Sequence, residues 1–192
     1  MKRLLLLFLI CCFVLCGCNT TSSVENPKSQ SGVSDGSFSF ETGNIKFTIP
    51  SQQQYILTEA RSDLTSVTIC DFSYGDANLT VSVLDCRKYT ENEISERLVY
   101  WNNSNEDKFS NLTYDSSTEL SVMGENILFS IFVDYSSNSP VSHYISTFTD
   151  SHYIYLMEII LRSNSSSVLD SVREMITSSE YIGPQKRFEN SQ

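Results

Sequence analysis

Several segments between residues 43 and 161 alternate apolar and polar side chains, and short stretches rich in Gly, Asn, Asp and Ser separate them. The longest alternating set consists of Ile127, Phe129, Ile131, Val133 and Tyr135. A period of two predicts a strand that buries one face, and the interrupting residues are typical of turns. We therefore expect a chain organised around an antiparallel sheet.

About seven strands are expected. The stretch "GNIKFTIP" at 43–50 predicts a strand that Pro50 ends, and residues 64–85 predict a hairpin. A further turn at 124–126 joins two strands, and residues 141–161 predict a second hairpin. Residues 51–62 are expected to form a loop with a few apolar plugs, namely Tyr55, Ile56 and Leu57.

Two segments change to a helical period. Thr90 followed by Glu93 matches a capping box, and it precedes a stripe made of Ile94, Leu98 and Trp101. Near the C-terminus a second apolar stripe consists of Val168, Leu169, Val172, Met175 and Ile176. The expected fold class is α+β, a largely antiparallel sheet of about seven strands flanked by two helices.

The first residues predict export. Lys2 and Arg3 precede an apolar run over 4–16, which is shorter than the roughly 20 residues of a membrane-spanning helix. The run ends in Leu15-Cys16-Gly17-Cys18, which resembles the lipobox of bacterial lipoproteins. That resemblance implies cleavage before Cys18, a diacylglycerol thioether on its sulfur, and often an acyl chain such as palmitate on the new amine. An ordinary cleaved signal and an uncleaved anchor are the alternatives.

The sequence divides the chain into four parts. Residues 1–17 are expected to be a lipoprotein signal peptide, 18–36 a flexible tether rich in Ser, Asn and Thr, 37–183 one domain, and 184–192 a disordered tail. Removal of the signal takes the net charge from −10 to −12, because Lys2 and Arg3 leave with it. So acidic a protein is not expected to bind nucleic acid, whose phosphates require a basic surface.

Cys70 and Cys86 are the two cysteines that remain after Cys18. An even pair in an exported protein suggests a disulfide, and both positions lie on neighbouring predicted strands. Two buried free thiols are the alternative. A catalytic cysteine is disfavoured because no histidine lies near either one in the sequence.

The order of these elements is similar to that of the PsbP-like domain over residues 37–182. The resemblance rests on the strand "IKFTIP", the following hairpin, the central helix, the run of strands and the final helix "SVLDSVREMITS". It implies an α-β-α sandwich and, in several members, an accessory role at a membrane complex. No metal ligand of that family matches a position in this chain.

Catalytic chemistry has few candidates. The two histidines are His143 and His152, and Asp150 lies two residues from the second, so these three are the metal-ligand candidates. A histidine at the rim of a sheet with no metal is the alternative. The sequence contains no HExxH, GxSxG, CxxC or phosphate-binding loop. We therefore expect no catalytic residues, no resident metal and no cofactor.

Two functions stay open at this point. The first is a non-enzymatic accessory or binding module for an envelope or membrane complex, exported and lipid-anchored through Cys18 on the outer side of the cell membrane, or facing the periplasm if there are two membranes. Its partners would be the membrane and a membrane-associated protein. The second is a small membrane-tethered hydrolase that depends on His143, His152 or a metal.

Overall fold

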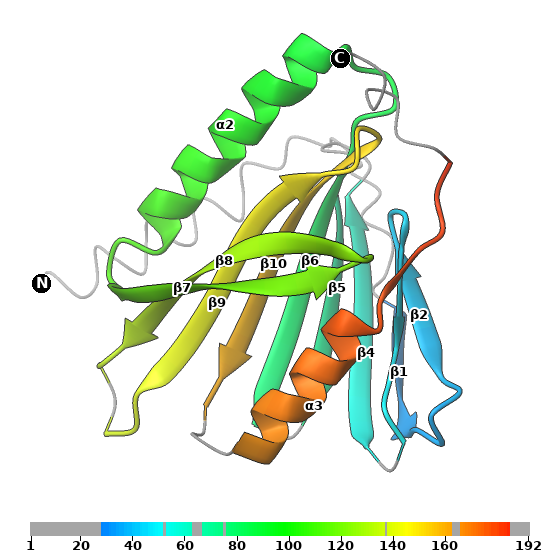
Figure 1. Ribbon diagram of the computed structural model, residues 1–192, viewed down its shortest axis with the longest axis vertical. Coiled ribbons are helices and arrows are strands. Elements are labelled where there is room, and N and C mark those ends of the chain that lie inside the picture. Colours follow the sequence, from blue (N-terminus) through cyan, green and yellow to red (C-terminus); the bar gives the residue numbers. More distant parts are fainter. Residues whose placement is uncertain are drawn as a thin grey trace, which may run out of the picture.

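The computed structural model describes residues 28–51, 53–62, 67–74, 76–136, 138–162 and 166–184. Figure 1 shows the arrangement of its elements. In chain order they are β1 (Lys28–Val33), β2 (Ser39–Thr42), β3 (Ile45–Thr48), β4 (Gln54–Ser62), β5 (Val67–Tyr74), β6 (Ala77–Asp85), α2 (Glu91–Lys108), β7 (Thr113–Val122), β8 (Glu125–Asp134), β9 (Val141–Thr149), β10 (Tyr153–Leu161), α3 (Ser166–Thr177) and β11 (Glu180–Tyr181).

Eight strands form one antiparallel sheet in the order β1-β4-β5-β6-β10-β9-β8-β7, and β11-β3-β2 form a second sheet. The large sheet consists of two meanders, one from β4 to β6 and one from β7 to β10. Pairing of β6 with β10 joins them, and α2 is the connection between them along the chain. In Figure 1, β7 and β8 run roughly horizontally whereas β5 and β6 run roughly vertically, so the large sheet is strongly twisted.

The two faces of the large sheet bury different clusters. On β10, Tyr155, Met157 and Ile159 point into the main core, which also includes residues of the small sheet and of α3. Ile154 points to the opposite face and packs with Leu84, Cys86 and Ile94 under α2. A strand buried on both faces explains why "YIYLMEIIL" is apolar at nearly every position.

The start of α2 follows its sequence signal. The Glu93 carboxylate accepts hydrogen bonds from the backbone N–H and the hydroxyl of Thr90, at 2.7 and 2.9 Å. In return, the Glu93 N–H donates to the Thr90 hydroxyl at 3.4 Å. The predicted capping box is confirmed, and these bonds hold the pKa of Glu93 below its usual value.

The expected fold class is wrong. The described residues form a mostly β protein with eleven strands in two sheets and two helices, rather than about seven strands flanked by two helices in a PsbP-like sandwich. The hairpins at 67–85 and 141–161 and both helices lie where the sequence predicts them. The difference comes from strands at the N-terminal end and from the separate small sheet.

The expected tether and the expected loop also differ from the structure in their boundaries. Residues 28–33 were expected within the tether and residues 51–62 within a loop, but β1 pairs with β4 along six consecutive positions, from Lys28 opposite Glu59 to Val33 opposite Gln54. Every side chain of β1 is exposed, so backbone hydrogen bonds rather than burial define this strand. Residues 18–27 of the expected tether and 185–192 of the expected tail lie outside the described residues.

No helix within the described part of the chain is long and apolar enough to span a membrane. The expected signal peptide at 1–17 lies outside that part.

Candidate functional site

Asp150 lies in the turn between β9 and β10, and its side chain is completely buried. One carboxylate oxygen, Oδ1, accepts hydrogen bonds from the backbone N–H groups of His152 and Tyr153, at 2.9 and 2.8 Å. The other, Oδ2, accepts from Asn44 Nδ2 at 2.7 Å and from the Tyr155 hydroxyl at 2.9 Å. Four donors therefore surround this carboxylate.

These four bonds make Asp150 a structural residue. A carboxylate offers about four lone-pair positions, so this one has none left for a metal ion. Asn44 belongs to the turn between β2 and β3, and its own N–H donates to the Tyr155 hydroxyl at 2.9 Å. The cluster therefore fastens the small sheet to the β9–β10 turn, and burial raises the pKa of the Tyr155 hydroxyl above its usual value.

His143 and His152 lie at opposite ends of the β9–β10 hairpin. His143 is opposite Ile160, seven residues along β10 from Tyr153, whereas His152 lies in the turn. At about 3.3 Å per residue their backbones are about 23 Å apart. Among the described residues no three His, Cys, Asp or Glu side chains are grouped as metal ligands would be. The candidate set His143, Asp150 and His152 is therefore not brought together.

His143 has a partner, Glu158, that lies 15 residues away in the sequence. Its Nδ1 lies 3.0 Å from Oε1 of Glu158, and only 14% and 9% of the two side chains are exposed. Glu158 is opposite Ile145 on the neighbouring strand, which makes it the diagonal neighbour of His143 on the face that α2 covers. The signal was a single acidic residue inside the apolar run of β10, because a buried carboxylate requires a partner.

The two cysteines of the domain are also separated. Cys70 of β5 is opposite Val81, and Cys86 lies five residues further along, just beyond the end of β6. This register puts their Cα atoms about 17 Å apart, whereas a disulfide requires about 4.4–6.8 Å. Cys86 is a buried thiol and not part of a disulfide. Cys18, the expected lipidation site, lies outside the described residues.

A pocket of about 610 Å³ opens between the C-terminal part of α2 and the sheet. Its origin can be followed in the sequence of the helix. Ile94, Leu98 and Trp101 pack on the cluster below, but residues 102–108 are all polar and the next apolar residue is Phe109. The helix therefore has no apolar side chain to fill the space over β8 and β9, and we define this space as the α2 pocket.

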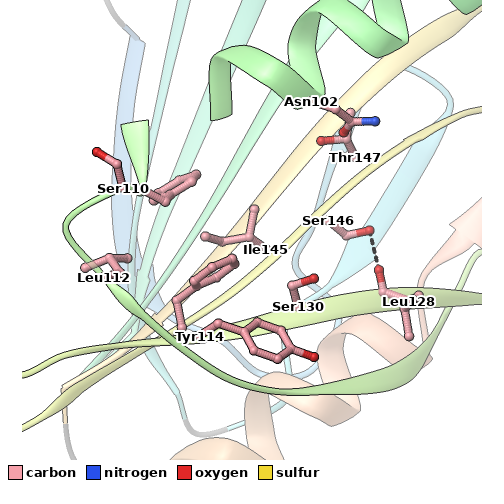
Figure 2. A pocket seen from close by; sticks show the side chains of 11 residues that line it. Asn102, Ser110, Leu112, Tyr114, Leu128, Ser130, Ile145, Ser146 and Thr147 are labelled. Carbon is pink, nitrogen blue, oxygen red and sulfur yellow. Dashed lines mark hydrogen bonds between the residues drawn. The ribbon is translucent and has the colours of Figure 1, made fainter. Parts of the chain in front are cut away.

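The walls of the α2 pocket are aromatic and aliphatic. The Phe132 ring lies 6.4 Å from Phe109 in a stacked arrangement and 5.7 Å from Tyr114 in an edge-on one. Ile145 forms part of the floor, and Leu128 lies at the mouth with 60% of its surface exposed. Figure 2 shows Asn102 and Thr147 at the end near α2, with Tyr114 and Leu128 on the far side.

The polar groups of the α2 pocket are hydroxyls and one amide. Ser110, Ser130, Ser146, Thr147 and Tyr114 supply the hydroxyls, and Asn102 supplies the amide. The hydroxyl of Ser146 donates to the carbonyl of Leu128 at 2.7 Å, as drawn in Figure 2. None of the described residues that line the pocket carries a formal charge at neutral pH.

The His143–Glu158 pair lies next to this pocket. The His143 ring is 6.5 Å from that of Phe109, and His143 is opposite Phe132 in the β8–β9 register. An apolar cavity with a few polar groups and a buried ionisable pair beside it is the usual form of a ligand site. We therefore take the α2 pocket as the candidate functional site. The interrupted stripe after Trp101 was the sequence signal for it.

No family model, curated protein or solved structure matches the chain.

Proposed function

We propose that this protein is an exported lipoprotein, anchored to the membrane through a diacylglyceryl group on Cys18, whose domain is a non-enzymatic binding module. The sequence Leu15-Cys16-Gly17-Cys18 at the end of a short apolar run carries the proposal. The domain would serve as an accessory to a membrane or envelope complex, with the α2 pocket as its binding site.

The position of the first strand supports a short tether. Nine residues, 19–27, separate Cys18 from the start of β1 at Lys28. Such a segment spans at most about 30–36 Å when fully extended. A domain held at that distance stays close to the membrane, and its net negative charge disfavours contact with anionic headgroups.

The chemistry of the described groups supports a binding role. The carboxylate of Asp150 is occupied by four donors, and His143 and His152 lie at opposite ends of their hairpin. The hydroxyls that line the α2 pocket lie among aromatic and aliphatic side chains, an arrangement suited to holding a ligand.

The anchor is tested by replacing one cysteine of the motif at a time. Cys18→Ala should accumulate as an unprocessed precursor or leave the membrane, because no thioether can form. Cys16→Ala is the matched control and should be processed and membrane-bound like the wild type. Each is followed by gel mobility and by partition into detergent. A processed, membrane-bound Cys18→Ala protein would refute the anchor.

The accessory role is tested separately. Extraction of the lipidated protein from its own membranes in mild detergent should recover one membrane or envelope protein in a fixed ratio. Repeated recovery of the protein alone would contradict the accessory role and would leave the anchor intact.

A further inference from the structure

The α2 pocket differs from the rest of the domain in its charge. The chain as a whole has 23 acidic and 13 basic residues. None of the described lining residues carries a formal charge at neutral pH, and the two ionisable groups beside the pocket, His143 and Glu158, already contact each other at 3.0 Å. Among the described lining residues, a ligand with a net charge would therefore lose its hydration without meeting an opposite charge.

The aromatic lining of the pocket favours a ligand that contains a ring. Phe109, Phe132 and Tyr114 present aromatic surfaces in both stacked and edge-on orientations. Aromatic groups pack on one another with centroid separations of about 4.5–7 Å, so a planar apolar group could extend this cluster. Ser130 and Asn102 offer donors and acceptors for one or two polar substituents of the ligand.

We propose that the α2 pocket binds an uncharged small molecule with an apolar, planar ring system and one or two hydroxyl or carbonyl groups. The volume of about 610 Å³ lies within the usual range of about 300–1,000 Å³ for small-molecule sites. The proposal rests on the proposed function only in taking this pocket as the binding site, and it does not depend on the lipid anchor.

Three naphthalene derivatives that differ in charge test the ligand class. They are 2-naphthalenemethanol, which is neutral, 2-naphthoate, which is an anion, and 2-naphthylmethylammonium, which is a cation. The full chain, as it is recovered from cells, is titrated with each. Trp101 is the single tryptophan and the neighbour of Asn102, so 5-fluorotryptophan at that position gives one ¹⁹F resonance from the protein alone.

The neutral alcohol should shift this resonance in a saturable way and bind at least about tenfold more tightly than either ion. Binding of none of the three would overturn the proposal and also the α2 pocket as the binding site. Equal binding of the alcohol and an ion would overturn the ligand class alone. Neither result bears on the processing of Cys18, which is measured separately.

Substitutions in the pocket locate the binding. Thr147→Asp places a carboxylate beside the bound ring, so affinity for the alcohol should fall at least about tenfold while the ammonium compound gains affinity. Thr48→Asp puts the same charge on β3, away from the pocket, and should leave all three affinities unchanged. Ile145→Trp fills the floor and should abolish binding. Unaltered affinities in a folded Thr147→Asp protein would place the binding elsewhere and overturn the proposal.

Discussion

The hydroxyl of Tyr155 donates a hydrogen bond of 2.9 Å to the carboxylate of Asp150, and both side chains are completely inaccessible to solvent. The same hydroxyl accepts the backbone N–H of Asn44. One phenol therefore connects the central strand β10, the turn that precedes it and the turn of the small sheet.

Tyr155→Phe removes both bonds and leaves the Asn44 N–H and one Asp150 oxygen with fewer partners. Loss of a buried hydrogen-bond partner typically costs about 1–3 kcal/mol. The free energy of unfolding, measured with urea, should therefore decrease by this amount. Tyr135→Phe is the control, since 62% of Tyr135 is exposed, and it should change the unfolding free energy by less than about 0.5 kcal/mol. Equal effects of the two substitutions would contradict the structural role of Tyr155.

The same hydroxyl should make stability depend on alkaline pH. Burial raises the pKa of Tyr155 above its usual value of 10.0, so above pH 10 the unfolded chain loses this proton while the folded protein keeps it. The contribution of this hydroxyl to the free energy of unfolding is complete below pH 10. It decreases as the pH rises above 10, by at most about 1.4 kcal/mol per pH unit. Urea unfolding at several values between pH 9 and 11 should show a shallower decrease in Tyr155→Phe. Parallel decreases in both proteins would be evidence against the raised pKa.

Gly43 lies against this hydroxyl. Its φ is +60°, and a Cβ placed there would lie 2.7 Å from the Tyr155 oxygen. Gly124 has a φ of +80° and nothing within 4 Å of such a Cβ, so the pair separates backbone strain from steric contact. Gly124→Ala should lower the free energy of unfolding by about 1 kcal/mol, and Gly43→Ala should lower it clearly more, as measured by thermal or urea unfolding. A similar cost at both positions would mean that the β2–β3 turn moves freely away from Tyr155.

The His143–Glu158 pair should be more costly to break than to replace. Glu158→Leu removes the carboxylate that contacts the buried His143 ring, and loss of a buried hydrogen-bond partner typically costs about 1–3 kcal/mol. The double variant His143→Leu/Glu158→Leu removes both polar groups and should recover part of that loss. Guanidinium unfolding of Glu158→Leu, of the single variant His143→Leu and of the double variant gives the coupling free energy. Strict additivity would show that the pair contributes nothing as a pair.

The sequence predicted the elements in which the pattern of apolar and polar side chains indicates the buried face. Alternation located both main hairpins, and the capping box located the start of α2. Alternation did not predict β1, because all six side chains of this strand are exposed and neither of its faces is apolar. β1 becomes a strand by backbone pairing with β4, which is a long-range property that local periodicity does not contain.

The candidate site was less predictable than the fold. Asp150 and His152 are close in sequence and suggested a metal, but the nearest donors to Asp150 include Asn44 and Tyr155, which local spacing does not bring together. The α2 pocket exists because α2 has no apolar side chain after Trp101 and because the twisted sheet passes below this part of the helix. The sequence contained only its indirect signals, the polar run after Trp101 and the acidic residue within β10.

The lipid on Cys18 can be read from the intact mass of the protein extracted from its own membranes. We expect a chain that begins at Cys18, with the mass of residues 18–192 increased by a diacylglyceryl group, with or without one further acyl chain. A mature chain that starts at another residue, or one that starts at Cys18 with an unmodified thiol, would contradict it.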